Sequence, residues 1–305
     1  MTGLAQPNPA PAAEASTARR GLLLVALAAV LWSTGGLIVR SLETTDVWTT
    51  VFWRSVFAAG FLGIFIVVRD RGRAIEAFRT MGAPGLLVAA CFATASISLV
   101  VALNLTSVAN TLVILSTSPL IAAVLGRISL GEQVRGRSWL AMAAAVVGVA
   151  IMVSESFGRG AWTGDLMAFV IALCVATATV TIRKHRHVRM TPATCLAAVA
   201  AAAVAAPWAH PWAVTGGDFG LLAVFGAVQL GAGLALFVTG ARLAPAAEVA
   251  LVSVLEPILG PIWVWVVLDE HPGTAALIGG GIVLGALAIH MAMDMRRARP
   301  IPPAI

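Results

Sequence analysis

Residues Leu243–Glu270 read LAPAAEVALVSVLEPILGPIWVWVVLDE, and this stretch decides the fold. Its apolar run is long enough to cross a bilayer, which takes about 20 residues. Two prolines, Pro257 and Pro261, interrupt the run, and Glu256 directly precedes the first of them. Because proline lacks a backbone N–H and disturbs the preceding helical turn, the pattern predicts a membrane helix that is broken near its middle.

An earlier stretch, Leu105–Glu132, repeats this pattern as LTSVANTLVILSTSPLIAAVLGRISLGE. The two stretches align without a gap at a shift of 138 residues, and a mid-span proline and a Leu-x-Glu exit fall in register. The matched pairs are Leu105/Leu243, Ala109/Ala247, Pro119/Pro257, Leu130/Leu268 and Glu132/Glu270. The alignment predicts a chain built from two related halves, because a broken helix in the same position of both halves is typical of secondary transporters.

The composition requires a membrane protein. The chain has 305 residues, of which 59% are hydrophobic and 11% charged, whereas soluble domains carry about 25% charged residues. A cytosolic enzyme, a nucleic-acid reader and a disordered protein are therefore excluded. We expect an all-α integral membrane protein with ten transmembrane helices, at 22–42, 47–67, 86–103, 107–125, 138–153, 164–182, 194–208, 219–239, 246–268 and 274–293.

The positive charges predict the orientation of these spans. With the N-terminus in the cytoplasm, 17 of the 20 Lys and Arg residues fall on the inner side, Arg40 and Arg159 fall outside, and Arg54 lies within a span. Such a bias is the positive-inside pattern. Five spans in each half is an odd number, so the two halves must insert with opposite orientation as inverted repeats. Both termini are then cytoplasmic, and we expect a multi-pass protein of the cell (inner) membrane.

These motifs resemble the drug/metabolite transporter superfamily, specifically its EamA-like ten-helix exporters. The resemblance rests on Arg54, on SPLIAAVLGRISLGE and on LEPILGPIWVWVVLDE, and it extends less securely to the aromatic amino-acid exporters. It implies two five-helix units, 19–157 and 158–294, around a central cavity, with export by alternating access. A disordered tail over 1–18 and a cytoplasmic tail over 295–305 complete the expected organisation. The first half departs from the pattern at Ser118, which replaces the acid of the Glu-Pro pair.

Glu256 is the sharpest candidate for a substrate-binding residue. A carboxylate inside a membrane span is costly unless it faces a cavity or a partner. It either contacts a substrate amine, carries a proton, or, when protonated, only bonds a neighbouring helix. The prolines Pro119, Pro257 and Pro261 are the candidate hinges.

Arg54 lies about two turns into the second predicted span. It pairs with Glu256, holds a substrate carboxylate, or extends its long stem to the outer headgroups. We favour the last of these interpretations.

Neutral polar residues are further candidates for lining the cavity. Gln229 is the best of them, because an amide in hydrocarbon needs partners, whereas hydroxyls often bond their own helix. The others are Trp32, Ser33, Asn110, Ser116, Ser118, Thr177 and Ser253. Three scattered cysteines and five histidines give no metal-ligand spacing, so we expect no metal and no cofactor.

We therefore expect no enzyme but a secondary transporter that exports small metabolites, with amino acids as the first guess. Its partners are a small-molecule substrate and the lipid bilayer, without nucleic acid. A lipid or lipid-linked metabolite flippase of the same fold is the nearer alternative and would show a lateral opening. An intramembrane transferase is the more remote one, because no catalytic cluster is seen. The small-residue motifs Gly281-x-x-x-Gly285 and Ala144-x-x-x-Gly148 serve packing within a monomer or a weak homodimer.

Overall fold

The computed structural model describes residues 11–44, 46–70, 74–130, 136–158, 161–185, 188, 190–241, 243, 249 and 252–298. Every regular element in this part of the chain is helical. The elements are α1 (Pro11–Ser33), α2 (Gly35–Ser41), α3 (Val47–Asp70), α4 (Ala74–Thr80), α5 (Gly82–Leu105), α6 (Val108–Leu115), α7 (Ser118–Leu130), α8 (Gly136–Gly158), α9 (Trp162–Lys184), α10 (Thr191–Ala205), η1 (Pro211–Ala213), α11 (Gly216–Ala223), η2 (Val224–Ala232), α12 (Gly233–Ala241), α14 (Leu255–Leu268) and α15 (Thr274–Ala298).

Six helical segments of the described residues are long and apolar enough to cross a membrane. They are Ser16–Ser41, Val47–Arg69, Gly82–Leu105, Val108–Ser129, Trp162–Ile182 and Gly216–Phe237. Four shorter apolar helices accompany them, at Trp139–Ser154, Thr191–Ala205, Leu255–Leu268 and Thr274–Ile289. An all-helical membrane protein is thereby confirmed. The predicted fifth, seventh, ninth and tenth spans fall on the shorter helices.

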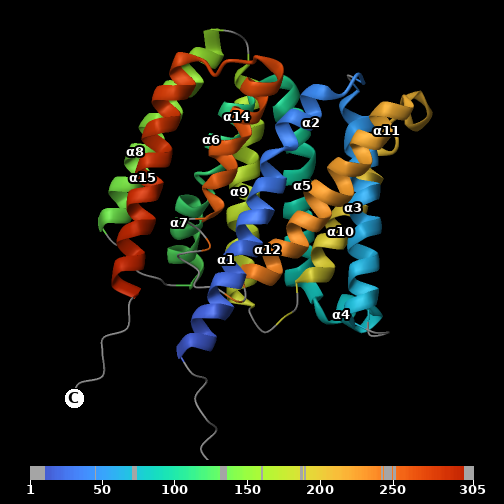
Figure 1. The fold of residues 1–305 in the computed structure, drawn as a ribbon, viewed down its shortest axis with the longest axis horizontal. Helices are drawn as coiled ribbons and strands as arrows, with labels where there is room; N and C mark the ends of the chain where they lie inside the picture. Colours follow the sequence, from blue (N-terminus) through green and yellow to red (C-terminus); the bar gives the residue numbers. More distant parts are fainter. Residues whose placement is uncertain are drawn as a thin grey trace, which may run out of the picture.

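The helices run along a common direction and place the free ends of α1 and α15 at the same end of the bundle (Figure 1). We call this the terminal end, and the opposite end, which carries residues 42–44, 46 and 269–273, the distal end. α8 and α15 pack together on one side of the bundle, while α3 and α10 pack together on the other. α1 begins at Pro11, within the stretch expected to be a disordered tail.

Close backbone contacts hold the α8–α15 pair together within the chain. A Cβ added at Gly148 would lie 2.6 Å from the carbonyl oxygen of Gly279. Small residues at this crossing therefore serve packing between α8 and α15. Gly281 and Gly285 have nothing within 4 Å of an added Cβ, so they are not part of that contact.

Several of the long membrane segments are interrupted. α6 ends at Leu115 and α7 begins at Ser118. The hydroxyls of Ser116 and Thr117 donate to the carbonyls of Val113 and Ile114 at this break. Pro119 follows in the first turn of α7, where its missing N–H leaves no intrahelical bond unmade. The first span is likewise divided at Thr34 into α1 and α2.

In the ninth predicted span the two prolines do not both interrupt a helix near its middle, as the sequence had predicted. α14 starts at Leu255, so Pro257 lies in its first turn, where no N–H is needed. Pro261 lies inside the helix and is the proline that deprives an earlier carbonyl of its partner. A nine-residue π-helical segment, η2, follows α11 without a gap. Nothing in the sequence pattern indicates this segment, and π-helical turns occur frequently at functional sites.

Candidate functional site

The break between α1 and α2 lies in the middle of the bundle, opposite η2. Gln229 of η2 is buried, and its Nε2 donates to the carbonyl oxygen of Trp32 at 3.0 Å. The other amide atom, Oε1, is buried without a hydrogen-bond partner. A Cβ at Gly35 would lie 2.8 Å from Gln229 Nε2, so glycine is needed where α2 approaches η2.

Trp32 and Ser33 extend this polar region toward α12 and α14. The indole Nε1 of Trp32 is buried without a hydrogen-bond partner and lies close to Gly233, at which an added Cβ would be 2.4 Å away. Ser33 is fully buried and accepts a hydrogen bond from Trp263 Nε1 at 2.9 Å. The central polar cluster, as we call it, therefore consists of Trp32, Ser33, Gln229 and Trp263.

Arg54 lies beside this cluster and not at the headgroups. The residue is 2% exposed, so the expectation that its stem extends to the membrane surface is wrong. Its Nη1 donates to Ser96 Oγ at 2.7 Å, and its Cζ lies 4.4 Å from the centroid of the Phe225 ring. Its Nε has no hydrogen-bond partner. No ion pair between Arg54 and Glu256 is present among the described residues.

Glu256 stands in the first turn of α14 and is half-buried. The partial positive charge of a helix N-terminus favours an ionised carboxylate at such a position. Among the described residues we find no hydrogen bond to its side chain. The sequence shows that Glu256 precedes Pro257, but it does not predict that Glu256 stands at the start of a helix.

The remaining predicted residues separate into two groups. Asn110 lies toward the distal end, where its Nδ2 donates to Asp165 Oδ1 at 3.2 Å. Three hydroxyls donate hydrogen bonds to carbonyls of their own helix and not to the central polar cluster. They are Ser116 with Val113, Thr177 with Leu173 and Ser253 with Val249. Ser118 begins α7 and is half-buried.

An ion pair at the distal end links α2 to Glu270, which follows α14. Arg40 Nε lies 3.1 Å from Glu270 Oε2, and Arg40 Nη2 donates to the Thr106 carbonyl at 2.9 Å. Three elements that are far apart in the sequence are therefore tied at one point. Below, this contact is called the distal latch.

Two further carboxylates strengthen the distal end. The oxygens of Asp218 at the start of α11 accept from the backbone amides of Glu43 and Thr44 at 3.0 and 2.9 Å. Asp165 Oδ1 at the start of α9 accepts from Thr106 Oγ1 at 2.8 Å. Both carboxylates lie in the first turn of a helix, where negative charge is stabilised.

Asp46 connects the segment before α3 to the segment after α10. It accepts hydrogen bonds from the Thr49 hydroxyl and the Trp48 amide and lies 3.4 Å from His210 Nδ1. Partial burial acts to raise the pKa of Asp46, but these hydrogen bonds outweigh it and hold the pKa below its usual value.

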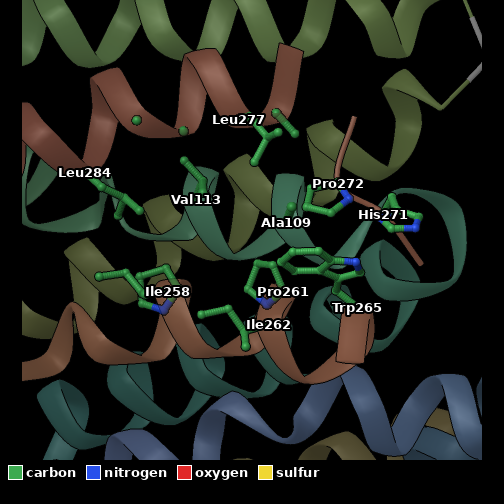
Figure 2. Close-up of a pocket in the computed structure, with 14 residues that line it drawn as sticks. Ala109, Val113, Ile258, Pro261, Ile262, Trp265, His271, Pro272, Leu277 and Leu284 are labelled. Atoms are coloured by element: carbon green, nitrogen blue, oxygen red, sulfur yellow. The ribbon is translucent and has the colours of Figure 1, made fainter. Parts of the chain in front are cut away.

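An apolar groove of about 370 Å³ lies between α6, α14 and α15. Figure 2 shows side chains of α14, among them Ile258, Pro261 and Trp265, along one wall, and Leu277 and Leu284 of α15 along the other. Ile258 and Leu277 are 42% and 61% exposed, so the groove opens to the side of the bundle. A second apolar groove of about 230 Å³ lies between α6, α8 and α9 and includes Asp165.

A bundle of apolar helices with interrupted members around buried polar groups defines a polytopic membrane protein of the transporter type. The EamA-like transporter family model matches residues 19–154 and 162–292, and the chain belongs to that family. It therefore contains two EamA repeats, and the family indicates a membrane transporter of small molecules. No group of three His, Cys, Asp or Glu side chains in the described residues is arranged to hold a metal ion.

A solved structure titled "Crystal structure of protein" resembles this fold with a TM-score of 0.66 at 19% sequence identity. The alignment covers 92% of this chain and 99% of the other, so the likeness extends over the whole bundle and concerns the fold alone. A search of curated protein sequences found no significant match.

Sequence reasoning missed several residues of the site. Trp263 is not among the residues singled out from the sequence, although its indole bonds Ser33 in the interior. Its distance of seven residues from Glu270 at the exit is the signal that would have placed it deeper. Ser96 and Phe225, the neighbours of Arg54, and the partners of the distal latch carry no such signal, because each belongs to a contact between helices distant in the sequence.

Proposed function

We propose that the protein is a secondary transporter that exports small metabolites, amino acids first among them. It would work by alternating access of two inverted five-helix repeats in a ten-span bundle. The observation that carries this proposal is the central polar cluster, in which a buried donor on Trp32 and a buried acceptor on Gln229 lack protein partners. Buried polar groups are normally paired, so such atoms favour a site that a polar solute completes.

The helix packing supports a two-fold relation between the halves. Exchange of the halves relates α1–α2 to α9, α3 to α10, α5 to α11–η2–α12, α6–α7 to the α14 span, and α8 to α15. Under this exchange the α5–α9 contact becomes α1–α12, and the α5–α10 contact becomes α3–η2. The α7–α9 contact becomes α1–α14, while α3–α10, α6–α14 and α8–α15 are each related to themselves. Every one of these contacts is present.

The register of individual residues supports the same relation. A Cβ at Gly260 of α14 would lie 3.5 Å from the Ser33 carbonyl of α1. In the other half, Ala122 of α7 and Ala176 of α9 share one apolar cluster. The shift of 138 residues that aligns the two halves relates Ala122 to Gly260. A small residue therefore stands at the equivalent position of α7 and α14.

Alternating access requires that one end be closed while the other admits the solute. The distal latch joins α2 to Glu270, which follows α14, and to Thr106, which lies between α5 and α6. Its rupture would open the distal end. The predicted positive-inside orientation makes this end the outer one in a cell (inner) membrane.

The proposal is tested by flux in liposomes that contain the purified chain. A panel of labelled amino acids is offered with and without a pH gradient, and the expected result is saturable flux of at least one of them. Liposomes that contain the Gln229→Ala variant serve as the site control. Absence of flux for every solute under both conditions would contradict amino-acid transport.

The second candidate function is movement of a lipid or lipid-linked metabolite. The apolar groove between α14 and α15 favours it, because an opening to the side of the bundle is what an acyl chain needs. One experiment distinguishes the two functions. Leu277→Trp would fill the groove, and it should stop headgroup-labelled lipid from changing leaflet if the groove is the route, but leave amino-acid flux unchanged.

A further inference from the structure

Arg54 is a buried cation without a buried anion beside it. It stands in the second turn of α3, within a bundle that crosses the membrane, and is 2% exposed. Its partners among the described residues are one neutral hydroxyl, Ser96 Oγ, and the face of the Phe225 ring. Burying a guanidinium in this way is costly, and charges at such depth are normally paired or face a solute pathway.

The carboxylates of the described residues are occupied elsewhere. Glu270 pairs with Arg40, Asp218 accepts from two backbone amides, and Asp165 accepts from two side chains. Glu256 belongs to α14, which packs against α1, α2 and α6, whereas α3 packs against α5, α10, α11 and η2. The counter-charge for Arg54 is thus not supplied by these groups.

Phe225 connects Arg54 to the central polar cluster. A Cβ added at Gly35 would touch both Phe225 Cε2, at 3.6 Å, and Gln229 Nε2, at 2.8 Å. Phe225 is itself fully buried under the guanidinium of Arg54. Arg54 therefore lies over the ring of Phe225, and Gln229 follows Phe225 by four residues on the same π-helical segment.

The atoms left without partners in this region have complementary chemistry. Arg54 Nε and Trp32 Nε1 are donors, and Gln229 Oε1 is an acceptor. A carboxylate needs donors, and planar guanidinium groups bind it with the best geometry. An ammonium group needs acceptors, such as an amide oxygen.

We propose that Arg54 binds the carboxylate of the transported solute and thereby selects α-amino acids over the corresponding amines. The solute's ammonium group faces the Gln229 amide oxygen. This inference rests on the proposed transport function and deepens it, because it names the group that one residue recognises. Arg54 is thus a specificity-determining residue.

The test uses the full chain in liposomes and two matched solutes. Flux of labelled phenylalanine is compared with flux of labelled phenethylamine, which lacks only the carboxylate, and unlabelled 3-phenylpropionate competes as the carboxylate without the amine. We expect wild type to prefer phenylalanine by at least about tenfold. Arg54→Gln should abolish this preference, and Arg54→Lys should keep part of it, because the charge remains without the planar geometry.

Arg69→Gln is the matched control. Arg69 lies on the same helix but is exposed, with its Cζ 5.8 Å from the Phe65 ring, so the phenylalanine preference should not change. If Arg54→Gln lowers flux of phenylalanine and phenethylamine by the same factor, Arg54 has only a structural role and the inference is wrong.

Wild type alone keeps the inference testable where Arg54→Gln does not fold. In that case 3-phenylpropionate must inhibit phenylalanine flux more strongly than phenethylamine does, and equal inhibition contradicts carboxylate recognition. Phenylalanine flux without carboxylate preference overturns this inference and leaves the transport proposal intact. Absence of flux for every amino acid overturns both.

Discussion

The distal end and the centre of the bundle differ in how far their polar groups are paired, although Arg40 Nε and Asp165 Oδ2 of the distal end are also buried without a hydrogen-bond partner. At the distal end Arg40 has Glu270, Asp218 has two backbone amides and Asp46 has a hydroxyl and an imidazole. In the centre, donors and acceptors on Trp32 and Gln229 are buried without partners. Paired groups hold elements together, whereas unpaired groups are costly unless something else completes them. This difference supports our proposal that the distal end acts as a closure and the centre as the binding site.

Glu256→Gln should have the largest effect on transport. Removal of the charge from the start of α14 is expected to lower flux of transported amino acids by at least about tenfold, as a carboxylate that carries a proton requires. Flux in liposomes with and without a pH gradient measures it. Glu43→Gln, an exposed carboxylate of the distal end, is the control and should leave flux unchanged. Full flux of every solute in Glu256→Gln would remove this carboxylate from the site.

Gln229→Ala tests the central polar cluster directly. Loss of the amide removes the hydrogen bond to the Trp32 carbonyl and the free acceptor together. We expect a KM for phenylalanine raised by about tenfold and a changed order of preference among amino acids. Thr239→Ala is the matched control, because that exposed hydroxyl bonds only its own helix. Retained specificity in Gln229→Ala would exclude the amide from the site.

Breaking the distal latch should affect access more than affinity. Arg40→Gln and Glu270→Gln each remove one charge of a pair whose side chains are 29% and 33% exposed. A partly exposed ion pair contributes about 1 kcal/mol. In a chain that carries Ser33→Cys, each variant should therefore speed labelling of that thiol by a membrane-impermeant reagent added at the distal side by a few-fold. The exchange Arg40→Glu with Glu270→Arg should restore slow labelling. Unchanged labelling in both single variants would mean that the latch does not close this end.

Acidification should weaken the Asp46 contacts, and the resulting loss of stability is the smallest of the effects predicted here. Because the folded-state pKa of Asp46 lies below its usual value, its contribution to stability is complete above the unfolded pKa and is lost as pH falls through the folded pKa. The melting temperature of Asp46→Asn should therefore lie below that of wild type by about 2 °C at neutral pH. The gap should close only in strong acid. A gap that grows on acidification would have the wrong sign.

The sequence predicted the features that depend on composition and local pattern. Apolar runs and Pro119 indicated the apolar helices and the break before α7. The Gln229 amide donates to the Trp32 carbonyl, but its oxygen has no partner, and its role as a binding residue stays a prediction. The division of the first span at Thr34 and the π-helical η2 were not predicted, because both depend on how α2 and η2 approach each other at Gly35. The burial of Arg54 was not predicted either, since the stem of an arginine at that depth reaches either the headgroups or the interior. Only the packing of α3 against α5 and η2 decides between them.

Access to the centre from both sides is the most direct test of alternating access. Ser33→Cys, in a chain whose Cys91, Cys174 and Cys195 are replaced, places one thiol at a position with no exposed surface in this structure. A membrane-impermeant thiol reagent is added to either face of the liposomes. Alternating access predicts labelling from both faces, slowed by saturating phenylalanine and faster from the distal face in Arg40→Gln. If the reagent labels Ser33→Cys from neither face, both with the intact latch and in Arg40→Gln, a solute path through the bundle is contradicted.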